Sequence, residues 1–175
     1  MSKTIQIPAA FQKAPFYVGK KELQYEKMPF SQELEHFFFL YEIAALQGEE
    51  ARKPWAEKEV AVPAVLESWK QHNGKIAHLF RERKRTEAKE PMVRYAAHFL
   101  SALYWMNDSR ISSLEHMQEE LEKLPVKPVN IAERIGFILE QPGHYHSFIQ
   151  LSQLYEELEK LFAKMLLIQK KTSPQ

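Results

Sequence analysis

Six apolar side chains near the end of the chain recur with alternating spacings of three and four residues. They are Phe148, Leu151, Tyr155, Leu158, Phe162 and Met165. This recurrence places all six on one face of an α-helix, and the alternation of three and four is typical of a packing seam between helices. We therefore predict a long helix over residues 147–168, about 33 Å at about 1.5 Å per residue. Ser147 and Gln150 are expected to form its capping box.

The same periodicity recurs along most of the chain, whereas the two-residue alternation of half-buried strands does not. Five glycines in 175 residues and 45% apolar residues favour a soluble helical protein. We predict one all-α domain, a bundle of six to eight helices over residues 31–170. Residues 1–30, rich in proline and aromatic residues, are expected to form an irregular arm packed on the body, with at most one short strand in residues 16–26. A frayed tail is expected over residues 171–175.

Proline, glycine and asparagine set the expected helix ends. The first helix is expected over residues 31–47, before Gly48. Pro63 is expected to open the next helix and Asn73-Gly74 to end it. The segment Pro91–Met106 is apolar nearly all round, which predicts a central, buried helix.

Charge and cysteine content exclude several classes of function. The chain has 24 basic and 23 acidic residues, so its net charge of +1 gives no overall attraction to nucleic acid or to an anionic membrane. It has no cysteine, which excludes disulfides, thiolate nucleophiles and cysteine-ligated metal centres. Neither a signal-peptide pattern nor a membrane-spanning run is evident. We expect a cytoplasmic protein without a cofactor.

A Pro-Gly break is followed by two histidines that flank a tyrosine, in "QPGHYHS". His144 and His146 would point to one side only on an extended backbone, but they lead into the predicted last helix. Without a clear third ligand they make a poor metal site, so no metal is predicted. The favoured interpretation is a polar turn in which Tyr145 anchors the helix start. A binding role for these three residues is the alternative, with an anion or a partner's carboxylate at the free amides.

Arg94, His98 and Ser101 share one face of the apolar segment 91–106. The four-residue spacing lets Arg94 and His98 meet one partner. An internal ion pair or hydrogen bond to a neighbouring helix is the favoured interpretation, because charges on a buried helix need compensation. A small polar pocket, and with it an enzyme, is the alternative.

Recognised catalytic patterns are absent or incomplete. Glu33 and His36 form a single E-x-x-H, whereas di-iron bundles need this motif twice together with two further glutamates. We therefore expect a solvated first turn of a helix there. The patterns of zinc proteases, serine hydrolases and phosphate-binding loops do not occur.

A run of basic residues, "RERKRTEAK", follows the predicted turn at Asn73-Gly74. Arg81, Lys84 and Arg85 are expected on one helix face, with Lys75 upstream, as a modest basic patch. Without interleaved aromatic residues a solvated helix end is favoured. Nucleic-acid contact through these four residues is the alternative.

The segments "HFLSALYWMND" and "KPVNIAERIGFILEQPGHYHSFIQLSQLYEELEKLFAK" resemble the YpoC-like proteins of Gram-positive bacteria. The resemblance covers roughly residues 90–165 and includes no catalytic signature. It implies no reaction and no functional residue. Genes of that family tend to lie near genes for DNA repair, replication initiation and a penicillin-binding protein, which implies a cytoplasmic accessory role.

By elimination, the sequence favours a non-catalytic protein that interacts with another protein. Trp55, Trp69 and Trp105 exceed what a small core obviously needs, and aromatic side chains are common interface anchors. The alternatives are a nucleic-acid-associated accessory protein that uses Lys75 to Arg85 and an enzyme with a polar His/Arg pocket.

Overall fold

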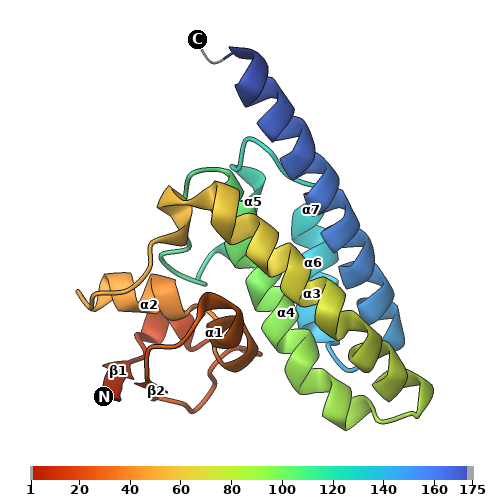
Figure 1. Cartoon of the computed structure of the whole chain (residues 1–175). Helices are drawn as coiled ribbons and strands as arrows, with labels where there is room; N and C mark the ends of the chain where they lie inside the picture. The colour runs from red at the N-terminus through yellow and green to blue at the C-terminus, as the bar shows by residue number, and fades with distance from the viewer. Residues whose placement is uncertain (1, 173–175) are drawn as a thin grey trace.

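A computed structural model describes residues 2–172, in which two short strands precede seven α-helices (Figure 1). The strands are β1 (Lys3–Gln6) and β2 (Glu22–Tyr25). The helices are α1 (Phe30–His36), α2 (Leu40–Leu46), α3 (Lys58–Arg81), α4 (Arg85–Met106), α5 (Met117–Glu122), α6 (Ile131–Glu140) and α7 (Tyr145–Thr172). Helix, including two short 3-10 helices, accounts for 64% of the described residues, which confirms the predicted all-α class.

The N-terminal arm is more regular than predicted. Strands β1 and β2 pair antiparallel, with Lys3 opposite Tyr25 and Ile5 opposite Leu23. Ile5 and Leu23 point inward and are buried, so this small sheet covers part of the core with one face. Of the frayed tail expected over residues 171–175, Lys171 and Thr172 belong to α7, and the remainder lies outside the described residues.

The single helix predicted over residues 31–47 is wrong, because Phe37–Phe39 separate α1 from α2. Phe39 has a left-handed backbone, with φ of 57°. Its ring packs against Phe11 and Phe16 of the arm, with centroids 5.4 and 5.0 Å apart. Tyr17 donates a hydrogen bond of 2.6 Å to the Phe38 carbonyl, which the break leaves without a helical partner. Aromatic packing on the arm therefore outweighs continuation of the helix.

Two prolines and an Asn-Gly pair do not bound helices as predicted. Helix α3 begins at Lys58, contains Pro63 and passes through Asn73-Gly74. Helix α4 begins six residues before Pro91 and contains it. Each proline removes one hydrogen bond near the start of a long helix. Burial of apolar side chains along both helices offsets these losses, because α3 and α4 pack together along their length.

The core lies where α3, α4 and α7 pack side by side, with α6 behind them (Figure 1). As predicted, α4 is central, and Phe99, Leu100 and Leu103 are fully buried. The Trp69 ring of α3 stacks on Tyr155 of α7, with centroids 4.5 Å apart. The Tyr155 hydroxyl donates to the Tyr95 carbonyl of α4 at 2.5 Å, so one side chain joins three helices.

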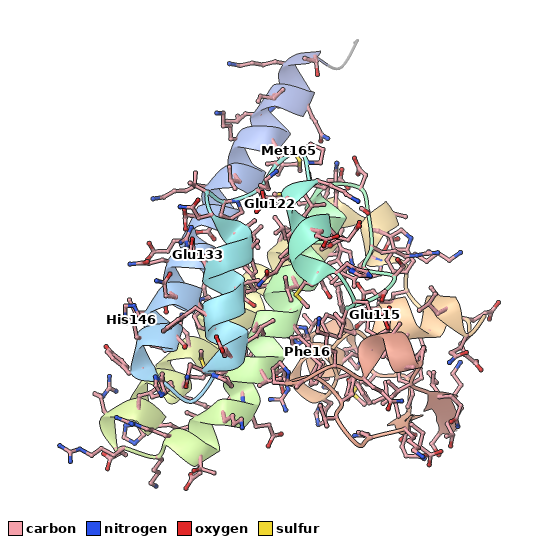
Figure 2. All side chains as sticks on the ribbon, turned by 180° about the vertical axis from the view of Figure 1, so that it is seen from behind. Phe16, Glu115, Glu122, Glu133, His146 and Met165 are labelled. Atoms are coloured by element: carbon pink, nitrogen blue, oxygen red, sulfur yellow. The ribbon has the colours of Figure 1, made fainter. Side chains whose placement is uncertain are left out.

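The predicted seam of α7 is buried from Phe148 to Phe162. Beyond Phe162 the helix leaves the body, and Met165 lies where this departure begins (Figure 2). Ser147 does not cap the helix, which begins at Tyr145. Instead the Ser147 hydroxyl donates to the Gln141 carbonyl at 2.6 Å and holds the preceding turn.

Candidate functional site

His98 is buried in the core and is held by one hydrogen bond. Its Nε2 donates to the Leu34 backbone carbonyl of α1 at 2.6 Å. Burial lowers the pKa of His98 to about 4, the Leu34 carbonyl opposes this shift, and the positive charge of Arg94 adds to it. At neutral pH the imidazole is therefore uncharged and positions α1 on α4.

Arg94 does not share a partner with His98. Its Nη2 donates to Glu90 of the same helix at 3.0 Å, and its Nε has no hydrogen-bond partner among the described residues. His98 bonds instead to the Leu34 carbonyl, and its ring packs against Tyr95 with centroids 5.5 Å apart. The Arg94–His98 pair expected from the spacing is therefore not a joint polar site.

A buried carboxylate that the sequence analysis assigned to solvent joins the arm to the helices. Glu33 in α1 is only 1% exposed. Its two oxygens accept hydrogen bonds from Tyr25 of β2 at 2.7 Å and from Tyr41 of α2 at 2.9 Å. Arg52 Nε lies 3.4 Å from the same group. No local pattern marks Glu33, because its partners come from three other segments.

A second buried carboxylate, Glu42 of α2, faces α4. Trp105 Nε1 donates to its Oε2 at 2.9 Å, whereas Oε1 has no hydrogen-bond partner among the described residues. Burial raises the pKa of Glu42 to about 7, although Trp105, Ser101 and Arg110 each lower it. Ser101, expected on a polar face of α4, thus lies near Glu42 rather than near a ligand site.

The tryptophans proposed as interface anchors have structural roles. Trp69 and Trp105 are buried in the core. Trp55 is half-buried, and its ring carries the guanidinium of Arg110 at 4.8 Å from the ring centroid. Two of the three therefore cannot reach a partner in the folded protein.

The three residues around the start of α7 do not face one way. The His146 ring packs edge-on against Phe137 of α6, with centroids 5.4 Å apart (Figure 2). The Tyr145 ring packs edge-on against Phe80 of α3 at 5.8 Å, yet Tyr145 remains 53% exposed. His144 offers its backbone carbonyl to the amides of Ser147 and Phe148. Tyr145 thus anchors the helix start on α3, and one side of its ring stays open.

The basic residues lie around a turn rather than on one helix face as predicted. Arg81 ends α3, Lys84 lies in the turn and Arg85 begins α4. Arg83 closes the turn with a left-handed backbone, φ 58°. Its amide bonds to the Phe80 carbonyl, and the Lys84 amide bonds to the Leu79 carbonyl at 2.8 Å. Lys75 lies six positions before Arg81, rotated by about 240° around α3, and so falls outside this group.

The structure brings the basic turn and the start of α7 together. Phe80, one residue before Arg81, is the residue on which Tyr145 packs. A Cβ on Gly143 would lie 3.5 Å from the carbonyl oxygen of Arg85, so the α6–α7 turn rests on the start of α4. We call this region the basic end. It consists of Arg81, Arg83, Lys84, Arg85, Lys89 and Tyr145.

A groove of about 900 Å³ adjoins the basic end at Lys89. The arm, the start of α5 and one side of α6 line it. Its charged residues are Lys13, Lys89, Glu119 and Glu140, so it has no net charge to attract an anion. Gly136 opens its floor, where a Cβ would lie 2.9 Å from Gln118 Nε2.

Within residues 2–172, no three His, Cys, Asp or Glu side chains gather as metal ligands would. In the same residues, no helix combines the length and the apolar character that crossing a membrane requires.

The sequence profile of the YpoC-like protein family matches residues 59–170. The chain belongs to the YpoC-like family. The match extends the resemblance noted over residues 90–165 to nearly all of α3 and α7, and it includes both turns of the basic end. A relative in Bacillus subtilis (strain 168), "Uncharacterized protein YpoC", is 29% identical over 164 residues, which cover 94% of this chain and 96% of the relative. No solved structure is significantly similar to this chain. The YpoC-like family name states no activity.

Proposed function

We propose that the protein is a non-catalytic accessory factor that binds a partner protein through the C-terminal end of α7. One observation supports this most strongly. Helix α7 continues to Thr172, ten residues beyond Phe162, its last buried residue. These residues extend away from the other helices (Figure 1). A helix that is anchored along its first half thus presents a preformed second half.

Apolar side chains continue along this projecting segment. Leu167 and Ile168 are 61% and 52% exposed, and Met165 and Leu166 are half-buried. Leu161 and Met165 still pack against the core. Ile168, three residues after Met165, continues their row past the body of the protein. An apolar row on a free helix fits the groove of another protein, the common helix-in-groove mode of recognition.

Charge indicates the chemistry of the partner. Residues 160–172 include Lys160, Lys164, Lys170 and Lys171 and no acidic residue. None of the four lysines forms an ion pair with a described residue. The proposed partner therefore has an apolar groove bordered by Asp and Glu, because opposite charges at the rim steer and orient binding.

The enzyme alternative receives less support from the interior. His98, Glu33 and Glu42 are each held by other groups of this chain, and Arg94 pairs with Glu90. The location we propose is the cytoplasm, which the lack of cysteine supports.

The test compares three immobilised full-length proteins as bait for cell lysate. One is the natural protein, one carries Leu167→Glu with Ile168→Glu, and the control carries Val60→Glu with Val129→Glu. The control valines are also strongly exposed, 65% and 74%, but lie outside α7. The partner is then purified and titrated. We expect the natural protein and the control to bind it equally, and the α7 variant to bind at least tenfold more weakly.

Three outcomes would overturn the proposal. The α7 variant binds the purified partner as tightly as the natural protein does. Alternatively, sedimentation shows that the chain dimerises and that the α7 substitutions abolish the dimer, which makes a second copy the occupant. Or the projecting segment binds vesicles of phosphatidylglycerol and no protein, which makes it a membrane-surface helix.

A further inference from the structure

The basic end is a second exposed surface, at the opposite end of α7 from the proposed docking segment. Residues 81–89 include five basic residues and two acidic ones, Glu82 and Glu87, a net charge of +3. The rest of the chain must then carry a net charge of −2, since the total is +1. The turn from α3 into α4 is thus one of two basic regions of this protein, the other being the C-terminal end of α7.

The five basic side chains are free to bind. All are exposed, and none forms an ion pair or a hydrogen bond with a described residue. Several basic side chains elsewhere are paired, as Lys3 is with Glu49, Lys58 with Asp108 and Arg134 with Glu157. Unpaired cations within one tight turn create a local positive potential that favours a polyanion.

The turn retains an arginine where glycine is the favoured residue. Arg83 occupies the left-handed position just after α3, and glycine adopts this conformation without a steric penalty. The chain therefore carries a positively charged residue in a strained left-handed conformation within this turn. Backbone strain of this kind is often found at functional sites.

An open aromatic ring adjoins these charges. The Tyr145 ring meets Phe80 edge-on at 5.8 Å, and one of its faces stacks on Phe148 at 6.1 Å. About half of Tyr145 remains in solvent. Aromatic rings beside basic side chains bind single-stranded nucleic acids, because every unpaired base can stack on such a ring. A base within a duplex cannot.

We propose that the basic end binds single-stranded nucleic acid, with Arg81, Arg83, Lys84 and Arg85 on phosphates and Tyr145 stacked on a base. This goes beyond the proposed protein docking and does not depend on it, because Tyr145 and Leu167 lie about 33 Å apart along α7. The adjoining groove carries equal numbers of lysines and glutamates, so the contact is confined to the turn. A short footprint and binding without sequence preference follow from this geometry.

The test measures fluorescence anisotropy of labelled oligothymidine and oligouridine of about 20 nucleotides with the full-length protein. With about four phosphate contacts, the slope of log affinity against log salt should be about −3. Raising salt from about 50 to about 200 mM should therefore weaken binding by about 50-fold. Tyr145→Ala should weaken binding roughly tenfold, whereas Tyr145→Phe should retain it.

A matched charge control distinguishes the effect of losing these particular charges from the effect of lowering the net charge of the protein. The variant Arg81→Gln, Lys84→Gln, Arg85→Gln should abolish binding at moderate salt. The control Lys20→Gln, Lys21→Gln, Lys27→Gln removes the same charge from exposed lysines near β2 and should bind normally. The α7 variant Leu167→Glu with Ile168→Glu should also bind normally, so failure of either proposal leaves the other testable.

Four results would overturn this inference. The first is that the protein binds neither oligonucleotide at low salt, and the second is that the two triple variants lose the same affinity. The third is that duplex is bound as tightly as single strands and Tyr145→Ala has no effect. The fourth is that the protein binds phosphatidylglycerol vesicles instead of oligonucleotides. Thermal unfolding of each variant excludes misfolding as the cause of a loss.

Discussion

The indole of Trp105 donates a hydrogen bond of 2.9 Å to the carboxyl of Glu42, which joins α4 to α2 inside the core. Because the other oxygen of Glu42 has no partner among the described residues, the charged form of this group is poorly compensated. The carboxyl thus takes up a proton near neutral pH, with a pKa of about 7 against 4.5 when unburied.

We predict that Glu42 makes the protein less stable as pH rises. Between about 4.5 and about 7 the folded state holds a proton that the unfolded state has released, so the free energy of unfolding falls across this range. A difference of about 2.5 pKa units corresponds to about 3 kcal/mol. His98 acts in the opposite sense. In the folded protein its pKa is about 4, below the ordinary value of 6.5 for histidine. The stability contributed by the neutral imidazole is therefore lost as pH falls from about 6.5 to about 4.

The two opposing contributions overlap between pH 4.5 and 6.5 and should largely cancel in the natural protein. Urea denaturation at several pH values checks this. Glu42→Gln should leave a free energy of unfolding that rises with pH, and His98→Gln should leave one that falls. Identical pH profiles in all three proteins would contradict the assignment of both groups.

Trp69 and Tyr155 should be energetically coupled, since their rings are stacked 4.5 Å apart within the core. Trp69→Leu is expected to destabilise by about 3 kcal/mol, because it removes a large buried ring. A double-mutant cycle with Tyr155→Leu should give a coupling energy of about 1 kcal/mol. As a control, Trp69→Leu combined with Leu23→Ala in β2 should give additive effects. Additivity in the first cycle would show that the stacking contributes nothing beyond burial.

Glu33 should be essential for attachment of the N-terminal sheet. Glu33→Ala leaves the hydroxyls of Tyr25 and Tyr41 without their acceptor, and we expect a loss of about 3 kcal/mol. Amide hydrogen exchange in β1 and β2 should accelerate more than exchange in α4, because β2 loses a direct contact. Glu35→Ala, two positions along the same helix but exposed, should change stability by less than about 0.5 kcal/mol. Equal effects of the two substitutions would refute a special role for Glu33.

Local patterns predicted the helices whose apolar faces are long. The seam of α7 and the apolar circumference of α4 were sufficient to predict these two helices, because burial of their apolar side chains determines that both segments are helical. Local patterns predicted the wrong helix ends where packing against a distant segment determines them. Phe39 breaks the first helix to reach Phe11 and Phe16, and burial along α3 extends that helix through Asn73-Gly74.

The candidate sites show the same division. Sequence reasoning found the basic run and Tyr145 but treated them separately, because more than fifty residues lie between them. Their proximity depends on the contact between Tyr145 and Phe80 and on the packing of Gly143 against Arg85. Glu33 and Glu42 escaped notice because glutamate is rarely buried, and nothing near either residue in sequence marks its partners.

Stability and nucleic-acid binding should change in opposite directions when Arg83 is replaced by glycine. Arg83 occupies the C′ position of a Schellman motif, with its amide bonded to Phe80 and the amide of Lys84 bonded to Leu79. Arg83→Gly relieves the left-handed strain, and we expect the free energy of unfolding to rise by about 0.5 to 1 kcal/mol. The same substitution removes a phosphate contact, so oligonucleotide affinity should fall and the salt slope should flatten by about 0.7. Arg83→Ala should weaken binding equally but give no gain in stability, because alanine retains the steric penalty.

Urea denaturation and anisotropy on the same preparations check both effects. A glycine variant that is less stable than the natural protein would show that Arg83 stabilises the fold. A glycine variant that binds as tightly as the natural protein would show that Arg83 does not contact a ligand.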